Sequence, residues 1–172
     1  MYIDDLKSFT LTNLQFFKAC LDNELNATEA LISALPNDQL SYRPHPVNRS
    51  AYEVAEHIIA HVADLKVILQ GNICDEILTY PFSNAADGAG KLNALWAEVS
   101  ALLTSYPEEK WTDESVELLV TGKPLVSLPR MQMMWFFFFD IIHHRGQLSS
   151  YVRPMGGKNP AIYGYSADTM GE

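Results

Sequence analysis

Residues 131–152 read MQMMWFFFFDIIHHRGQLSSYV, and this stretch contains the longest apolar run of the chain, residues 133–139. The run is too short to cross a bilayer, because a membrane-spanning helix needs about 20 apolar residues, and Asp140 ends it. A helix that is apolar on every side is typical of a buried position. Ser127 is a suitable N-cap, so we predict a buried helix from about Ser127 to residues 152–154.

Three other stretches repeat apolar residues at helical spacing. The first covers residues 4–35 and stops before a proline. The second follows Ser50, which forms a capping-box pattern with Glu53, and ends at Gly71. The third covers residues 91–106 and is also followed by a proline. Together with the helix above, these stretches give four predicted helices.

Length and composition favour a single globular domain. The chain has 172 residues, of which 48% are apolar and 19% are charged, and these values are typical of a folded protein with its own core. Four long helices in one domain predict an all-α fold, a four-helix bundle that covers residues 1–172. Residues 108–126 are polar and rich in turn residues, and short strand pairing is the alternative to a loop there.

The charge of the chain argues against two classes of partner. The formal net charge is −9, and the 12 basic residues are scattered along the sequence. Binding to a phosphate backbone needs a stripe of Lys and Arg, so we expect no nucleic-acid partner. Anionic membrane surfaces are disfavoured for the same reason.

Cysteine usage and the first residues favour a cytoplasmic location. Cys20 and Cys74 form no C-x-x-C pair and match no catalytic motif, so we expect two reduced, mostly buried thiols. The opening sequence MYIDDLKSFT carries acidic residues and no apolar run, and this pattern does not indicate a signal peptide.

Histidines on two predicted helices indicate a metal site. Asp140 and His144 are four residues apart, so their directions from the helix axis differ by only about 40° and both can contact one ion. Carboxylate oxygen and imidazole nitrogen are ordinary ligands of zinc, nickel, iron and manganese. His57 lies among apolar residues of the second predicted helix, where a buried imidazole needs a partner. It could supply a third ligand.

The same residues allow other interpretations. An Asp–His pair at this spacing is often only a hydrogen bond or a weak ion pair. His61 lies one turn after His57 and offers an alternative ligand. His143 points about 100° away from His144 and is expected to face another helix or solvent. His45 is expected in a solvated loop.

The five consecutive aromatic residues 135–139 cover every direction around a helix, so they cannot all pack into one core. We expect the outward members to form a homodimer contact, and coverage by the C-terminal tail is the alternative. Beyond them, Arg145 is expected to flank the site or to form an ion pair at the surface or at an interface. Gly146 is expected to mark the close approach of another helix, because glycine inside a helix costs about 1 kcal/mol.

The stretch DIIHHRGQL at residues 140–148 resembles the closing-helix motif H-x-x-x-H-R-G-Q of the DinB-like superfamily, the DinB/YfiT-like metalloenzymes. The following YVRPMGG and IYG, and the upstream pattern Ser50-x-x-Glu53-x-x-x-His57, are similar to other parts of that family. The resemblance implies a four-helix bundle, often a homodimer, with a divalent metal held by one residue of the second helix and two of the fourth. Carried over, these residues are His57, Asp140 and His144. Position 140 departs from the pattern, because it is normally histidine.

The family resemblance also implies a function. It points to a metal-dependent hydrolase, or to a transferase that uses small thiols, with a small-molecule substrate. Zinc or nickel is the expected ion, and the oxygen ligand of Asp140 also suits manganese or iron. The alternative is a non-catalytic dimeric binding or stress-associated module with a degenerate metal site, which the aspartate favours. The sequence alone leaves both functions open.

Overall fold

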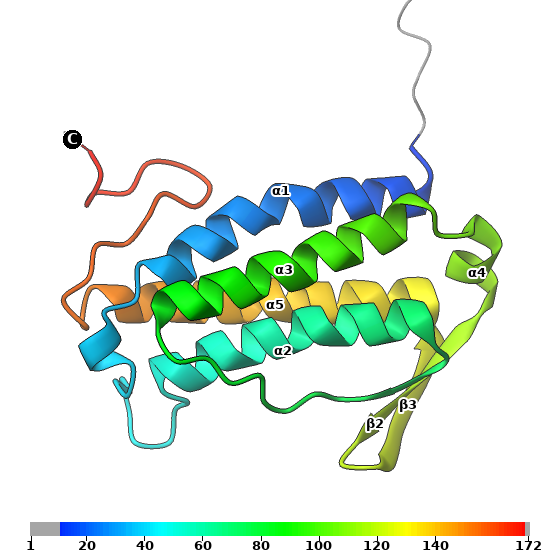
Figure 1. The fold of residues 1–172 in the computed structure, drawn as a ribbon, viewed down its shortest axis with the longest axis horizontal. Helices are drawn as coiled ribbons and strands as arrows, with labels where there is room; N and C mark the ends of the chain where they lie inside the picture. Colours follow the sequence, from blue (N-terminus) through cyan, green and yellow to red (C-terminus); the bar gives the residue numbers. More distant parts are fainter. Residues whose placement is uncertain (1–10, 171–172) are drawn as a thin grey trace, which may run out of the picture.

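Four long helices lie side by side and form the body of the molecule (Figure 1). The computed structural model describes residues 11–170, so residues 4–10 of the predicted first helix lie outside the described residues. Helices α1 and α2 each pack against both α3 and α5, so the four enclose a common core. The long helices are α1 (Asn13–Ser33), α2 (Ala51–Gln70), α3 (Ala85–Thr104) and α5 (Arg130–Val152).

Side-chain caps set the starts of three of these helices. Thr12 and Ser50 each form a capping box at the start of α1 and α2, as predicted for Ser50. Asn84 accepts a hydrogen bond from the Asp87 backbone N–H and starts α3 at Ala85, instead of the predicted residue 91. The prediction missed the first turn and a half of α3 because it relied on regularly spaced apolar residues, and these begin after the capping residue Asn84.

A small sheet accompanies the helices, so the strictly all-α prediction is wrong and the fold is mostly helical. Strand β1 (Ile73–Asp75) pairs in parallel with β2 (Ser115–Val120), and β2 pairs antiparallel with β3 (Lys123–Pro129). A short helix, α4 (Glu108–Asp113), precedes β2. Because β3 takes up residues to Pro129, α5 begins at Arg130 and not near Ser127.

The β2–β3 hairpin explains why residues 108–126 are rich in turn residues. Thr121 and Gly122 both have positive φ, 53° and 75°, which is the backbone of a two-residue hairpin turn. Val116 and Leu118 of β2 are buried. The sheet contacts the start of α5 and, through β1, helix α2. It therefore covers the bundle near one end (Figure 1).

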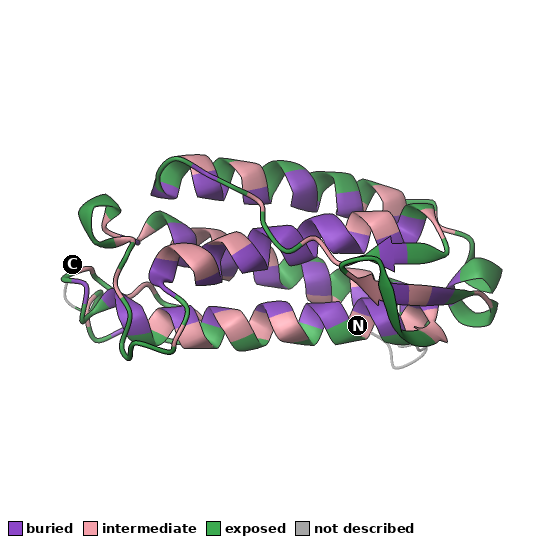
Figure 2. Cartoon of the chain, turned by 90° about the horizontal axis from the view of Figure 1, so that it is seen from below, coloured by how far each residue is buried: buried purple, intermediate pink, exposed green. Residues whose placement is uncertain are grey.

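Along the long helices, buried segments alternate with more exposed ones (Figure 2). Most of α2 is buried, and its buried residues include three polar side chains, His57, His61 and Asp64. Burial of three polar groups in one helix is costly unless each has a partner. Of the cysteines, Cys74 is buried and Cys20 is partly buried, and both are free thiols as predicted. No helix in residues 11–170 is long and apolar enough to span a membrane.

The aromatic run of α5 divides between the core and the surface. Phe137 and Phe138 are buried, whereas Phe136 and Phe139 are 53% and 61% exposed. The C-terminal tail does not cover these two side chains, so that alternative is wrong. A homodimer contact at this surface stays a prediction.

Arg145 lies in the core and does not contact the histidines. It forms an ion pair with Glu24 of α1 and donates to Thr28 and to the Tyr163 hydroxyl, and thereby ties the C-terminal tail to the bundle. An ion pair was one of the two predicted roles, but it was expected at the surface or an interface, and the structure buries it in the core. The expectation for Gly146 is wrong, because a Cβ atom there would meet nothing within 4 Å.

Candidate metal centre

The packing of α2 against α5 brings the three predicted ligands together. His57 lies on α2, whereas Asp140 and His144 lie one turn apart on α5. One ligand atom of each lies within 4.8 Å of the other two, and the rings of His57 and His144 have centroids 4.6 Å apart. Whether an ion binds there stays a prediction.

One carboxylate oxygen is the centre of this cluster. Asp140 Oδ2 lies 2.8 Å from His61 Nε2, 3.3 Å from His144 Nε2 and 3.7 Å from His57 Nε2. Two ligand atoms of one ion are roughly 3.0–3.4 Å apart, given metal–ligand bonds near 2.1 Å. The contacts of Asp140 with His57 and His144 are therefore close to the spacing of a shared ion, whereas the shorter contact with His61 is a hydrogen bond.

The orientation of His144 is set by its neighbours on α5. The Gln147 amide donates to the Tyr151 hydroxyl at 3.0 Å, so its Oε1 faces His144 Nδ1, also at 3.0 Å. With its Nδ1 turned to Gln147, the ring directs Nε2 toward the Asp140 carboxylate at 3.3 Å. A proton or a metal ion fits between these two atoms. An outer partner that fixes a histidine in this way is typical of metal sites.

His57 is the second ligand candidate, and it is buried with only 6% of its surface exposed. Its contact with Asp140 at 3.7 Å is longer than a hydrogen bond. Burial, followed by repulsion from His61, lowers the pKa of His57 to about 3. The imidazole is therefore neutral near neutral pH, which is the form that ligates metals.

Asp140 and His61 carry the charges of the cluster. Hydrogen bonds from His144 and His61 hold the pKa of Asp140 well below its usual range, so the carboxylate is ionised. Burial alone would lower the pKa of His61, but hydrogen bonds to Asp140 and Asp64 raise it to about 8. His61, left as an alternative by the sequence, thus makes the closest contact with Asp140, while His57 stays buried beside it.

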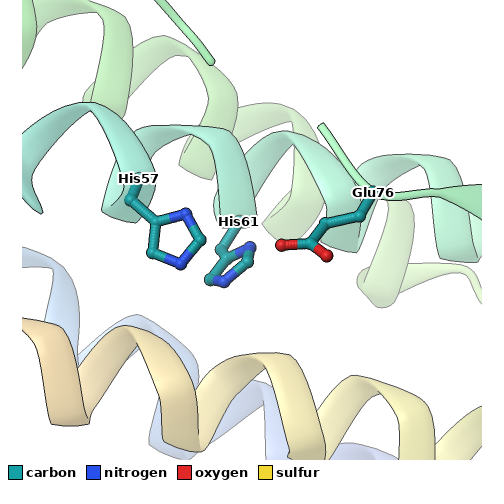
Figure 3. A group of neighbouring side chains, drawn as sticks. All are labelled: His57, His61 and Glu76. Atoms are coloured by element: carbon teal, nitrogen blue, oxygen red, sulfur yellow. The ribbon is translucent and has the colours of Figure 1, made fainter. Parts of the chain in front are cut away.

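Two acidic residues of this region were missed by sequence reasoning. Asp64 is fully buried, and its Oδ2 lies 3.1 Å from His61 Nδ1. A signal was present, because Asp64 follows His61 by three residues in an otherwise apolar stretch. Glu76 lies just after β1 and directs its carboxylate toward His61 (Figure 3). The sequence carried no signal for Glu76, because its position depends on the pairing of β1 with a distant strand.

The other two histidines lie where the sequence predicted them. His143 is exposed on α5, and His45 is exposed in the loop before α2. Neither belongs to a group of metal-ligating side chains within residues 11–170. His143 touches the ring of His144, with centroids 5.0 Å apart, but its own ring lies at the surface.

A small cavity of about 120 Å³ reaches the cluster from the side of the sheet. Its polar lining consists of His61, Glu76 and Asp140, and its apolar lining includes Leu118 and Phe137. A larger cavity of about 560 Å³ lies around Arg130, away from the histidines. That arginine donates to the backbone carbonyls of Ile68 and Gly71 at the end of α2, and its role is structural. The small cavity therefore borders the candidate metal centre at Asp140.

Known proteins share the fold of this chain. Uncharacterized protein YjoA of Bacillus subtilis (strain 168) is 28% identical over 148 residues, which cover 80% of this chain and 88% of the relative. The crystal structure of the DinB-like protein YjoA superposes with a TM-score of 0.65 at 20% identity, covering 82% of this chain and 92% of that one. A DinB-like protein from Bacillus cereus ATCC 10987 gives a TM-score of 0.69 at 21% identity, with 86% and 95% covered.

These two structures support the fold, and the sequence assigns the family. The sequence pattern of the DinB family matches residues 10–171, which is nearly the whole chain and includes all three candidate ligands. The chain belongs to the DinB family.

Proposed function

We propose that the protein is a metal-dependent enzyme, either a hydrolase or a transferase of small thiols, whose divalent ion is held by His57, Asp140 and His144. The observation that carries the proposal is the orientation of His144. Gln147 binds its Nδ1 at 3.0 Å, so Nε2 points at an ionised carboxylate 3.3 Å away, and ligand atoms of both lie within 4.8 Å of one of His57. A divalent ion placed between these atoms would contact all three side chains.

The donor set fits a divalent ion. Two neutral imidazoles and one carboxylate leave coordination positions open, as in catalytic rather than structural sites. Zinc or nickel suits the nitrogen ligands, and the Asp140 oxygen also admits manganese or iron. An ion in this position supplies one kind of chemistry, the lowering of the pKa of a bound water or thiol toward neutrality.

The remaining residues position this set and limit access to it. Gln147 and Tyr151 hold His144, and His61 holds the Asp140 carboxylate at 2.8 Å. Leu118 and Phe137 line the approach, so a substrate reaches the ligands through a narrow apolar passage of about 120 Å³. This passage suits a small-molecule substrate with an apolar part.

One observation favours the alternative, a non-catalytic module of the same fold. Asp140 replaces the family's histidine, and its carboxylate already accepts a hydrogen bond from His61. An ion is therefore not required to satisfy it. We also propose that the protein is a homodimer, because Phe136 and Phe139 form an exposed apolar surface on α5.

Metal content separates the enzyme from the module. Protein purified without a histidine tag is analysed by plasma mass spectrometry, as wild type, His144→Ala and His143→Ala. The proposal predicts a stoichiometric ion in the wild type and in His143→Ala, and loss of the ion in His144→Ala. His143→Ala is the matched control, because His143 neighbours the site but is exposed. A wild type that takes up no ion, even after incubation with zinc or nickel, would contradict the proposal.

A further inference from the structure

A second set of ligand atoms lies beside the first. One ligand atom each of His57, His61 and Glu76 lies within 4.8 Å of the other two. This set shares only His57 with the set of His57, Asp140 and His144. Figure 3 shows His61 between His57 and the Glu76 carboxylate, which extends from the segment after β1 toward the imidazole.

The combined cluster is too long for one ion. Among residues 11–170, His61 and His144 belong to no common group whose ligand atoms lie within 4.8 Å of one another, and their ring centroids are 6.5 Å apart. Ligand atoms of a single ion lie within roughly 4.2 Å of one another, twice a bond of 2.1 Å. Since His57 is already a ligand of the first ion, a second ion at His61 and Glu76 needs a partner other than His57.

Asp64 anchors both members of the second set. Its Oδ2 binds His61 Nδ1 at 3.1 Å, and its Oδ1 accepts the backbone N–H of Ile77, the residue after Glu76, at 2.9 Å. A buried carboxylate that holds one nitrogen of a histidine leaves the other nitrogen for a metal. Because Asp64 is fully buried, it fixes the imidazole and the Glu76 segment relative to each other.

In the metal-free protein, the His61 imidazolium faces two of the three carboxylates in this region. Asp64, Glu76 and Asp140 bring three carboxylates to a cluster whose remaining members are histidines. Glu76 and Asp140 also line the same cavity together with His61. A cation in the cavity would therefore contact one imidazole and two carboxylates and would keep positions open toward the entrance.

We propose that a second divalent cation binds between His61 and Glu76, and that Asp140 is shared between this cation and the ion at His57 and His144. The inference rests on the proposed function, because Asp140 is a ligand of the proposed first ion and its Oδ2 also lies 2.8 Å from His61 Nε2. A shared carboxylate is compatible with the separation of about 3.5–4 Å that is usual in two-metal sites. In the protein without metal, the Nε2 proton of His61 takes the place of the second cation beside Asp140.

The test counts ions in the full-length protein. Wild type, Glu76→Gln, Glu117→Gln and His144→Ala are stripped with chelator, incubated with excess Mn²⁺ and desalted, and bound manganese is measured by plasma mass spectrometry. Electron paramagnetic resonance then reports whether the ions are exchange-coupled. Glu117→Gln is the matched control, because Glu117 is also half-buried and lies in the same sheet region, on β2, but belongs to neither set. Circular dichroism checks the fold of each variant.

We expect two ions per chain and a coupled signal in the wild type and in Glu117→Gln. Glu76→Gln should retain one ion and lose the coupled signal. One ion in the wild type, unchanged in Glu76→Gln and lost in His144→Ala, would overturn the second position and leave the proposed function intact. A wild type that binds no ion would overturn both.

Discussion

The metal-free protein should lose stability as the pH rises, because His61 is held as an imidazolium between two carboxylates. Asp64 accepts from its Nδ1 at 3.1 Å, and Asp140 accepts from its Nε2 at 2.8 Å. These bonds raise the pKa of His61 to about 8, from an unfolded value near 6.5. A raised pKa stabilises the folded state fully below the unfolded pKa, and the contribution disappears as the pH passes through the folded pKa.

The size of this effect follows from the pKa difference. From 6.5 to about 8 is about 1.5 pKa units, and each unit corresponds to about 1.36 kcal/mol, so protonation contributes about 2 kcal/mol. The free energy of unfolding of the wild type, relative to His61→Gln, should therefore fall by about 2 kcal/mol between pH 6 and pH 9. His57, whose pKa is depressed to about 3, lowers stability only below its unfolded pKa near 6.5, so it contributes little to the change between pH 6 and pH 9.

Chemical denaturation with chelator present measures this difference at half-unit steps of pH. Glutamine at position 61 keeps a hydrogen-bonding group but does not titrate, so it isolates the protonation of the imidazole. His61→Gln also lowers the free energy of unfolding at every pH. The test is therefore how the difference between wild type and variant changes with pH. A difference that stays constant from pH 6 to pH 9, or that grows with pH, would refute the imidazolium between Asp64 and Asp140.

Two further predictions concern the rest of the molecule. Arg145→Met should lower the free energy of unfolding by about 3–5 kcal/mol, because it removes the ion-pair partner of the buried Glu24. Arg153→Met is the control at a half-exposed ion pair, and it should lower the free energy of unfolding by less than about 1 kcal/mol. Equal losses of the two variants in urea denaturation would contradict this. Phe139→Asp should convert the proposed homodimer to a monomer in sedimentation velocity without a change in circular dichroism, because Phe139 is 61% exposed. A wild type that is already monomeric at micromolar concentration would contradict the interface.

Local signals in the sequence predict most of the helices. The pair Ser50 and Glu53 marks the start of α2 because a capping box needs only four consecutive residues. Strand β1 has three residues, and its partner β2 begins more than 40 positions later. Such pairing is not encoded in any short window, so the sheet was not resolved. The antiparallel pair β2 and β3 is joined by a tight hairpin. The turn residues there indicated strand pairing as the alternative to a loop.

In the candidate site, too, local sequence patterns predict some residues, and long-range packing decides the others. Helical spacing predicts that Asp140 and His144 share a face, and the resemblance to the family adds His57. Sequence spacing could not choose between the contacts of His57 and His61, because both lie on the buried side of α2 and the helix packing places both near Asp140. Glu76 reaches the cluster only because β1 pairs with β2, and no local pattern reports that.

Zinc titration of position 140 tests the metal centre most directly. Chelator-stripped wild type, Asp140→Ala and Asp140→His are titrated with zinc by calorimetry at neutral pH. Alanine should weaken binding by more than roughly tenfold, since even outer-shell partners of a metal contribute 10–100-fold. Histidine should tighten it, because it restores the family's three nitrogens at a site where Asp140 now lies 3.3 Å from His144 and 3.7 Å from His57. Equal zinc affinity in all three proteins would show that position 140 is not a ligand and would contradict the proposed centre.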